Sequence, residues 1–356
     1  MLVTEKKLVK KPSIQSVDSF PLSNHHSIKN FAKSIILSIA DSGVSLSRSG
    51  SIMNSSASSR KPSVDNITCD MLSSNDNEET NRMVAQHYIL RSAFDGVDFS
   101  APINKLLSED DTVVLDVGCG SGTWTMETAT RFPHAQFIGI DKKPLFPQYI
   151  KPRNCKFKLF EITDNIQQVK LPFDDASVDF IFQRDLNWGL TEATWLPLVT
   201  EYFRILKPGG WIELVEPDYE TYSGSSREDL LINKMIDSFY LRRQDPFVSK
   251  RLSSYMATVG FRGIQSDFKS IPLGWGFQKL FHGKKQRTTL RCSEYARAAA
   301  NSRLELLQSL QPWFSREKNI SKSKYETLLG QLPDQWYKSK AYTNWHRTTA
   351  QKRFFN

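Results

Sequence analysis

The sequence predicts an α/β fold with a mostly parallel sheet covered by helices on both faces, preceded by a disordered N-terminal tail. From about residue 103 onward, apolar runs of strand length alternate with amphipathic stretches of helix length. The expected strands are continuously apolar, as strands of a parallel sheet buried on both faces are. Residues 45–74 are instead rich in Ser and Asn and nearly free of aromatic side chains, so they cannot bury a core that offsets chain entropy.

The tail is expected to cover residues 1–78 and one folded domain residues 79–356, starting with a helix over residues 81–91. Its motif-bearing core is expected over residues 103–216. The core elements, in order, are a strand at 113–117, a helix at 123–132, strands at 136–140, 156–160 and 178–183, a helix at 194–206 and a strand at 211–215. Alternation of this kind is typical of parallel strands joined by crossover helices.

An insertion of about residues 228–256 follows this core. Its apolar residues recur at helical spacing: Leu230, Leu231, Met235, Phe239 and Tyr240. Two interpretations stay open, a lid over a substrate and a helix packed at the sheet edge. A sixth strand is expected at residues 260–269, and a closing helix with the last strand, 341–350, within residues 286–356.

Composition and charge exclude several classes of protein. No run of about 18 apolar residues exists in the 356-residue chain, so no membrane-spanning helix is expected, and the Lys-rich start lacks a secretory signal. The four cysteines are far apart, which predicts neither a disulfide framework nor a metal site and favours the reducing cytosol or nucleus.

The net charge of +9 is uneven, because residues 271–356 carry 16 basic and 5 acidic side chains. This basic third is either a solvated surface or a face for an anionic partner. No Arg/Gly-rich tract or other nucleic-acid signature supports a nucleic-acid partner.

Two similar basic segments lie in the expected tail, Lys10-Lys11-Pro12-Ser13 and Arg60-Lys61-Pro62-Ser63. Basic residues two and three positions before a serine suit an acidic kinase pocket. Ser13 and Ser63 are therefore candidate phosphosites for a kinase partner, with chance occurrence in a Ser-rich tail as the alternative.

The most informative segment is the apolar run 113–117, which leads into three glycines at alternate positions, Gly118, Gly120 and Gly122. Glycines let the backbone turn sharply and let a ligand lie directly against it. The turn after the first strand of a doubly wound sheet is where such folds bind ligands. The sequence therefore predicts a ligand site here.

Three features of this segment favour S-adenosylmethionine over a dinucleotide. Thr123 stands where a dinucleotide turn has its last Gly or Ala. Asp116, two residues before the first glycine, would repel a pyrophosphate and attract an ammonium or sulfonium group. Asp141 ends the second strand, where an acid accepts both ribose hydroxyls of an adenosine. An NAD-type or ligand-free α/β domain is the alternative.

The segment from Asp116 to Gly122 resembles motif I of class I S-adenosylmethionine-dependent methyltransferases, and Asp141 matches their second-strand acid. Residues 171–180 and 206–211 resemble the segments before their fourth and fifth strands. Shorter likenesses at residues 77–91, 100–102, 183–184, 215–217 and 325–352 are similar to fungal LaeA-like methyltransferases. The resemblance implies a seven-stranded sheet whose last strand is antiparallel.

The resemblance also implies roles for individual residues. The three glycines would shape the turn under the methionine moiety, Asp116 would act on its ammonium group, and Asp141 would bind the ribose. The other implied contacts are Glu161 and Ile162 at the adenine edge, with Asp164 as the competing choice, Gln183 near the transferring methyl group, and Tyr88 with Arg91 closing over the cofactor. Catalysis by alignment needs no dedicated catalytic residue, and none is predicted.

Two function hypotheses follow. The first is an S-adenosylmethionine-dependent methyltransferase acting on a small molecule or a protein side chain. The second is a LaeA-like regulatory protein that binds the cofactor and partner proteins with weak or no turnover. The acceptor itself is not identified by any motif.

Overall fold

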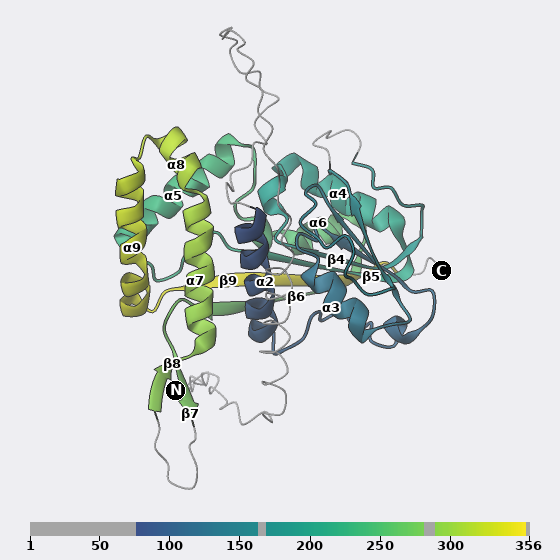
Figure 1. The fold of residues 1–356 in the computed structure, drawn as a ribbon. Coiled ribbons are helices and arrows are strands. Elements are labelled where there is room, and N and C mark those ends of the chain that lie inside the picture. Colours follow the sequence, from purple (N-terminus) through teal and green to yellow (C-terminus); the bar gives the residue numbers. More distant parts are fainter. Residues whose placement is uncertain (1–75, 163–168, 281–288, 354–356) are drawn as a thin grey trace, which may run out of the picture. The chain divides into compact units, whose positions relative to one another are not determined.

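The computed structural model describes residues 76–162, 169–280 and 289–353 (Figure 1). The expected tail, up to residue 75, lies outside the described residues. So do the candidate phosphosites Ser13 and Ser63 and the alternative adenine contact Asp164. The first described helix begins at Asp76, five residues before the start expected from the sequence at residue 81.

Seven strands of the described residues form one sheet in the order β3-β2-β1-β4-β5-β9-β6. Their bounds are β1 Val113–Val117, β2 Gln136–Asp141, β3 Cys155–Leu159, β4 Val178–Arg184, β5 Leu206–Pro217, β6 Arg262–Pro272 and β9 Tyr342–Gln351. Strands β1 to β5 pair in parallel, and β9 runs antiparallel between β5 and β6. The predicted mostly parallel seven-stranded sheet with an antiparallel last strand is confirmed.

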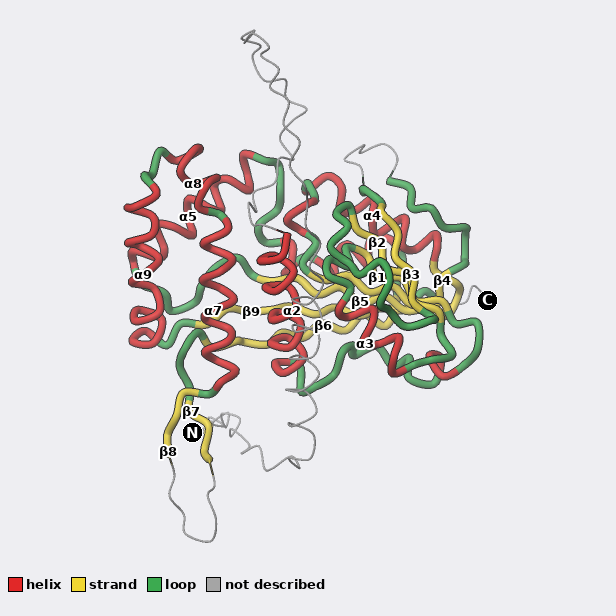
Figure 2. The backbone as a smooth tube through the Cα atoms, in the orientation of Figure 1, coloured by secondary structure: helices red, strands yellow, loops and turns green. Residues whose placement is uncertain are grey.

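Helices cover both faces of this sheet (Figure 2). Because successive side chains of a strand point to opposite faces, Phe180 and Phe182 of β4 pack toward α3, whereas Ile181 packs toward α4 and α6. The helices are α2 Asp76–Ala93, α3 Thr123–Arg131, α4 Glu192–Ile205, α5 Ser226–Leu241, α6 Leu252–Val259, α7 Glu294–Ser309, α8 Gln311–Lys318 and α9 Lys322–Ser339. None of these helices combines the length and apolarity needed to cross a bilayer.

The insertion packs into the core. Leu231, Met235 and Phe239 of α5 are buried, because a spacing of four residues keeps them on one helix face. Leu230 and Tyr240 fall off that face and are exposed, so grouping them with the buried stripe was wrong. The packed-helix interpretation of this segment is thus the one that the contacts favour.

The region between β6 and β9 is more elaborate than the sequence predicts. It contains a hairpin of β7 Phe277–Leu280 and β8 Thr289–Cys292, followed by three helices rather than one. Helix α7 lies beside α2, and α2 also contacts α3 and β6 (Figure 1). Helix α2 therefore bridges the two halves of the sheet at the ends of the strands.

Candidate functional site

A cavity of about 470 Å³ opens at the carboxyl ends of β1, β2 and β4, where parallel α/β sheets bind ligands. Its volume is in the range of small-molecule pockets. Six of the predicted cofactor residues line it: Asp116, Gly118, Gly120, Asp141, Glu161 and Ile162. The lining also includes one face of α2, residues 79, 82, 83 and 86.

The glycine turn has a conformation that only glycine adopts without strain at all three positions. Gly118, Gly120 and Gly122 have φ angles of +71°, +52° and +70°. A Cβ on Gly120 would lie 2.8 Å from the Met83 sulfur of α2. Gly122 does not line the cavity; a Cβ there would lie 2.5 Å from the Phe157 ring. Gly122 thus serves packing and the start of α3.

Asp141 ties the end of β2 to the glycine turn. Its carboxylate accepts hydrogen bonds from the backbone N–H groups of Gly120, at 2.8 Å, and Lys143, at 2.9 Å. Burial raises the pKa of Asp141, and these two hydrogen bonds oppose that rise. A carboxylate has about four lone-pair sites, so Asp141 keeps capacity for further donors such as ribose hydroxyls.

Asp116 lies in the floor of the cavity with 3% of its surface exposed. Burial raises its pKa to about 7, against the opposing effects of a hydrogen bond from Thr125 and the charge of Arg184. A buried carboxylate of this kind favours a cationic ligand group, because the cation would restore the interactions that water no longer provides.

The backbone of the glycine turn has little to offer a phosphate. The N–H groups of Gly118 and Cys119 both donate to the Ile140 carbonyl, and that of Gly122 donates to the Cys119 carbonyl. The N–H of Gly120 is used by Asp141. Dinucleotide and phosphate sites depend on such groups being free. These four N–H groups are therefore not available to a pyrophosphate.

Gln183 lies outside the cavity, contrary to its predicted place near the methyl group. It is fully buried, its amide donates to Glu216 at 3.0 Å, and its oxygen accepts from the Tyr202 hydroxyl at 2.7 Å. The next residue, Arg184, lines the cavity together with Phe182. Period-two alternation along β4 puts residues 182 and 184 on one face and Gln183 on the other, a signal that the sequence already carried.

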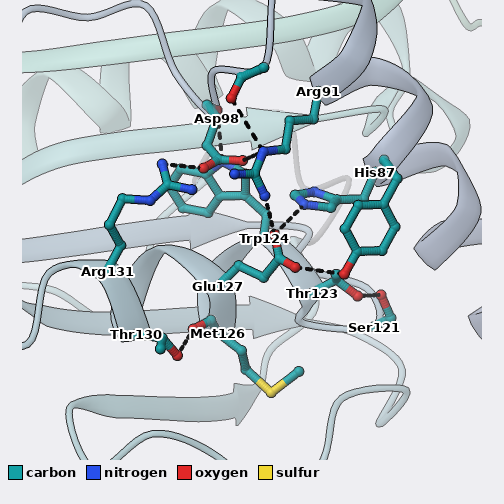
Figure 3. A network of polar contacts seen from close by, with 12 residues as sticks. His87, Arg91, Asp98, Ser121, Thr123, Trp124, Met126, Glu127, Thr130 and Arg131 are labelled. Carbon is teal, nitrogen blue, oxygen red and sulfur yellow. Dashed lines mark hydrogen bonds and ion pairs between the residues drawn. The ribbon is translucent and has the colours of Figure 1, made fainter. Parts of the chain in front are cut away.

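Tyr88 and Arg91 also lie outside the cavity lining, because they project from α2 on a different side from residues 79, 82, 83 and 86. Instead, His87, Tyr88 and Arg91 all bind the Glu127 carboxylate of α3, at 3.0, 2.6 and 2.9 Å (Figure 3). Burial alone would raise the pKa of Glu127, but the hydrogen bonds from His87 and Tyr88 lower it to about 2. These residues fasten α2 to α3 rather than close over a ligand.

The same network contains a set of metal-type ligands. His87, Asp98 and Glu127 bring ligand atoms within 4.8 Å of one another. The two carboxylates already face cations, since Arg91 pairs with both of them and Arg131 pairs with Asp98 (Figure 3). The arrangement is therefore better described as an ion-pair network than as a metal site.

His87 connects this network to the cavity. Both terminal nitrogens of Arg184 lie 3.3–3.4 Å from its Nδ1. Because a guanidinium only donates hydrogen bonds, Nδ1 accepts and the proton of the neutral imidazole is on Nε2, facing Glu127. Burial lowers the pKa of His87, which keeps the ring neutral.

Sequence reasoning gave no role to Asp185, which follows β4 and lines the cavity. Its φ of +57° is unusual for a residue other than glycine. Its carboxylate accepts hydrogen bonds from Gln86 of α2, at 3.0 Å, and from the Trp188 indole, at 3.1 Å. Its place two residues beyond the predicted strand at 178–183 was a signal for it.

Residues 114–210 match the family described as "Methyltransferase domain". The resemblance to class I S-adenosylmethionine-dependent methyltransferases is confirmed. This methyltransferase segment contains the glycine turn, Asp116, Asp141 and the ends of β3 and β4, and so most of the cavity.

The chain is also similar to curated fungal proteins. It is 27% identical over 209 residues to methyltransferase pytC of Aspergillus terreus, covering 56% of this chain and 60% of pytC. It is 33% identical over 114 residues to the secondary metabolism regulator laeA of Aspergillus fumigatus, covering 30% of this chain and 26% of laeA. The match thus spans about three fifths of pytC and about a quarter of laeA.

Among solved structures, the chain resembles a Haemonchus contortus phosphoethanolamine N-methyltransferase in complex with S-adenosyl-L-methionine. The TM-score is 0.39 with 15% identity, covering 75% of this chain and 56% of that chain. It also resembles a Methanosarcina mazei S-adenosylmethionine-dependent methyltransferase, with a TM-score of 0.34 and 24% identity, covering 50% of this chain and 92% of that one.

Proposed function

We propose that the chain binds S-adenosylmethionine in the 470 Å³ cavity and transfers its methyl group to a small-molecule or protein acceptor. The observation that carries this proposal is the glycine turn. The N–H groups of its three glycines are used within the protein, while two carboxylates, Asp116 and Asp141, face the cavity. This donor set suits a cationic nucleoside and opposes a pyrophosphate.

Each lining residue has a separate task in this proposal. Asp141 would accept the ribose hydroxyls, and Asp116 would attract the ammonium group of the methionine moiety. Gly118 and Gly120 would let the ligand approach the backbone, and Glu161 with Ile162 would lie at the adenine edge. S-adenosylmethionine supplies an activated methyl group when bound. The chain's contribution is to orient the groups and to exclude water, which α2 does by covering the cavity.

A second candidate function is regulation through binding. The similarity to proteins named as secondary metabolism regulators favours it. In that case the chain would bind the cofactor and partner proteins, and the expected tail of residues 1–78 would be the segment open to phosphorylation at Ser13 and Ser63. Cofactor binding is common to both candidates, so turnover is what separates them.

Incubation of the full chain with methyl-labelled S-adenosylmethionine and an extract of the source organism tests the proposal. We expect label to pass to one class of extract component with the natural protein and not with Gly120→Val. If S-adenosylhomocysteine binds the protein but no label moves, the regulatory function replaces the enzymatic one. If S-adenosylhomocysteine does not bind, both candidates fail.

A further inference from the structure

A second, smaller cavity of about 50 Å³ adjoins the first. It lies between α2, α7 and the ends of β5, β6 and β9, and it has room for a group of on the order of four water-sized atoms. The two cavities share four lining residues: Arg82, Gln86, Asp185 and Trp188. A group held in the second cavity would therefore point toward whatever occupies the first.

The walls of the second cavity are largely apolar and aromatic. Ile89, Leu90, Ile271, Leu306 and Trp345 line it. At its boundary with the first cavity, the rings of Trp188 and Tyr219 meet edge to face with centroids 4.8 Å apart. Aromatic rings at such a boundary bind cations through their faces and alkyl groups through contact area.

Most charged groups of this cavity have partners within the protein. Arg82 forms two hydrogen bonds with Glu79, at 2.9 and 2.7 Å. Arg303 donates to the Tyr219 carbonyl at 2.8 Å. Asp218 accepts from Ser249 at 2.7 Å and pairs with His346 at 3.1 Å.

Of the two acids that line this cavity, Asp218 pairs with a cationic side chain, whereas Asp185 does not. Its two hydrogen bonds come from the neutral side chains of Gln86 and Trp188. Within the described ranges, no Lys, Arg or His nitrogen forms an ion pair with its carboxylate within 4.0 Å, and the charges of Arg82 and Arg184 act on it only from a longer distance. A half-buried carboxylate with only neutral donors favours a cation, because such a partner recovers interaction lost on leaving water. Its left-handed backbone is a strained conformation of the kind found at functional sites.

We propose that the second cavity binds the amino group of the methyl acceptor, with Asp185 as its anionic partner and Trp188 and Tyr219 as its aromatic wall. This rests on the proposed function and deepens it by naming an amine as the acceptor class. The nitrogen of the amine lies at the boundary of the two cavities. It binds as an ammonium ion and passes one proton to the Asp185 carboxylate, which frees the lone pair that takes the methyl group as the sulfonium leaves as a neutral thioether. An acceptor that presents a neutral hydroxyl gains no ion pair with Asp185 and binds less well.

The test uses the full chain saturated with S-adenosylhomocysteine, and it needs no knowledge of the natural acceptor. The Trp188 indole N–H donates to Asp185, so its resonance in a ¹H–¹⁵N spectrum reports on that carboxylate. The probes are n-propylamine and n-propanol, which have the same number of heavy atoms. We expect propylamine to shift this resonance at concentrations at least tenfold lower than propanol does.

Two variants test the contributions of the carboxylate and of the cavity separately. Asp185→Asn should reduce the preference for propylamine to less than about threefold. Ala299→Leu fills the second cavity from α7 and should weaken propylamine binding at least tenfold without changing the affinity for S-adenosylhomocysteine. Ala300→Leu is the matched control, since Ala300 is equally buried on the same helix and does not line the cavity.

Equal binding of the two probes, or an unchanged preference in Asp185→Asn, overturns the proposal. Equal effects of Ala299→Leu and Ala300→Leu would overturn the placement in the second cavity. Failure of the natural protein to bind S-adenosylhomocysteine would instead refute the proposed function, so the two failures can be told apart.

Discussion

The two cavities share a wall but are assembled in different ways. The larger one is centred on one β–α–β unit, residues 113–141, and is completed by α2 and by the segments that follow β2, β3 and β4. The smaller one draws on α2, β6, α7, β9 and the segments after β4 and β5, which are far apart in the chain. Local turns can carry a recognisable motif, whereas a site assembled from distant segments depends on the whole sheet. We therefore expect deletions and substitutions to affect the two cavities differently.

The largest effect should come from removing β9, which joins β6 to the parallel part of the sheet, β1 to β5. Deletion of residues 339–356 leaves β5 and β6 without their shared neighbour and exposes two sheet edges. We expect aggregation rather than a protein that keeps the larger cavity alone. Sedimentation of the expressed protein measures this. A soluble truncated chain that still binds S-adenosylhomocysteine would show that the larger cavity is independent of the smaller one.

Gly120→Val should abolish cofactor binding, with a loss of at least about 100-fold. The new side chain meets Met83 and forces a branched residue into a left-handed conformation, which costs on the order of 1–3 kcal/mol on its own. Gly96→Val is the matched control, because Gly96 has a φ of +81° and no neighbour within 4 Å of an added Cβ. Calorimetric titration of both variants with S-adenosylhomocysteine decides it. Equal losses would mean that backbone strain, not the cavity, is responsible.

Asp141→Ala should weaken S-adenosylhomocysteine binding by roughly 10- to 100-fold, since charge-assisted hydrogen bonds contribute about 1.5–3 kcal/mol each before compensation. The structure adds a second cause, because the variant also loses the bond that holds the Gly120 N–H. Asp141→Asn should lose less, as its amide oxygen still accepts one hydrogen bond. If calorimetry shows the same affinity for Asp141→Ala and the natural protein, the assignment of this residue to the ribose is wrong.

The smallest expected effect concerns pH. Glu216 is the second-last residue of β5. Burial raises its pKa to about 8, compared with an ordinary value of 4.5. A carboxyl group with a raised pKa in the folded state stabilises the fold below its unfolded pKa, and this stabilisation is lost as pH rises through the folded value. The free energy of unfolding should therefore fall between pH 6 and 8, by on the order of 2 kcal/mol from this one group.

Urea unfolding at pH 6, 7 and 8 measures that fall. Glu216→Gln keeps the shape of the side chain and removes the titration, so its curve should be flatter than that of the natural protein. Burial lowers the pKa of His87, so this residue reduces the free energy of unfolding as pH falls below its ordinary pKa of 6.5. Its effect is opposite in direction to that of Glu216. A steeper pH dependence in Glu216→Gln would contradict this account.

The fold of the first half could be predicted from the sequence because each strand is an apolar run bounded by turn residues. The same holds for the glycine turn and Asp141, whose neighbours in space are also neighbours in the chain. The hairpin β7–β8 and helices α7 and α8 were missed, since short amphipathic segments do not reveal what they pack against. Tertiary contacts, not local pattern, decide their structure.

The site was predicted less completely than the fold. The resemblance places Gln183 at the cavity, whereas the two-residue period of the strand places Phe182 and Arg184 there. Tyr88 was chosen without the helical period that places Glu79, Met83 and Gln86 on the cavity side. The sequence places Asp185 just beyond a strand, but its left-handed backbone and its position between the two cavities are visible only in the structure.

The most direct test of the central claim is a calorimetric titration of the full chain with S-adenosylhomocysteine and, separately, with NAD. The account predicts one-site binding of S-adenosylhomocysteine and no heat of binding with NAD, because Asp116 and Asp141 line the cavity and the N–H groups of the three glycines are already used within the protein. Binding of NAD without binding of S-adenosylhomocysteine would contradict it.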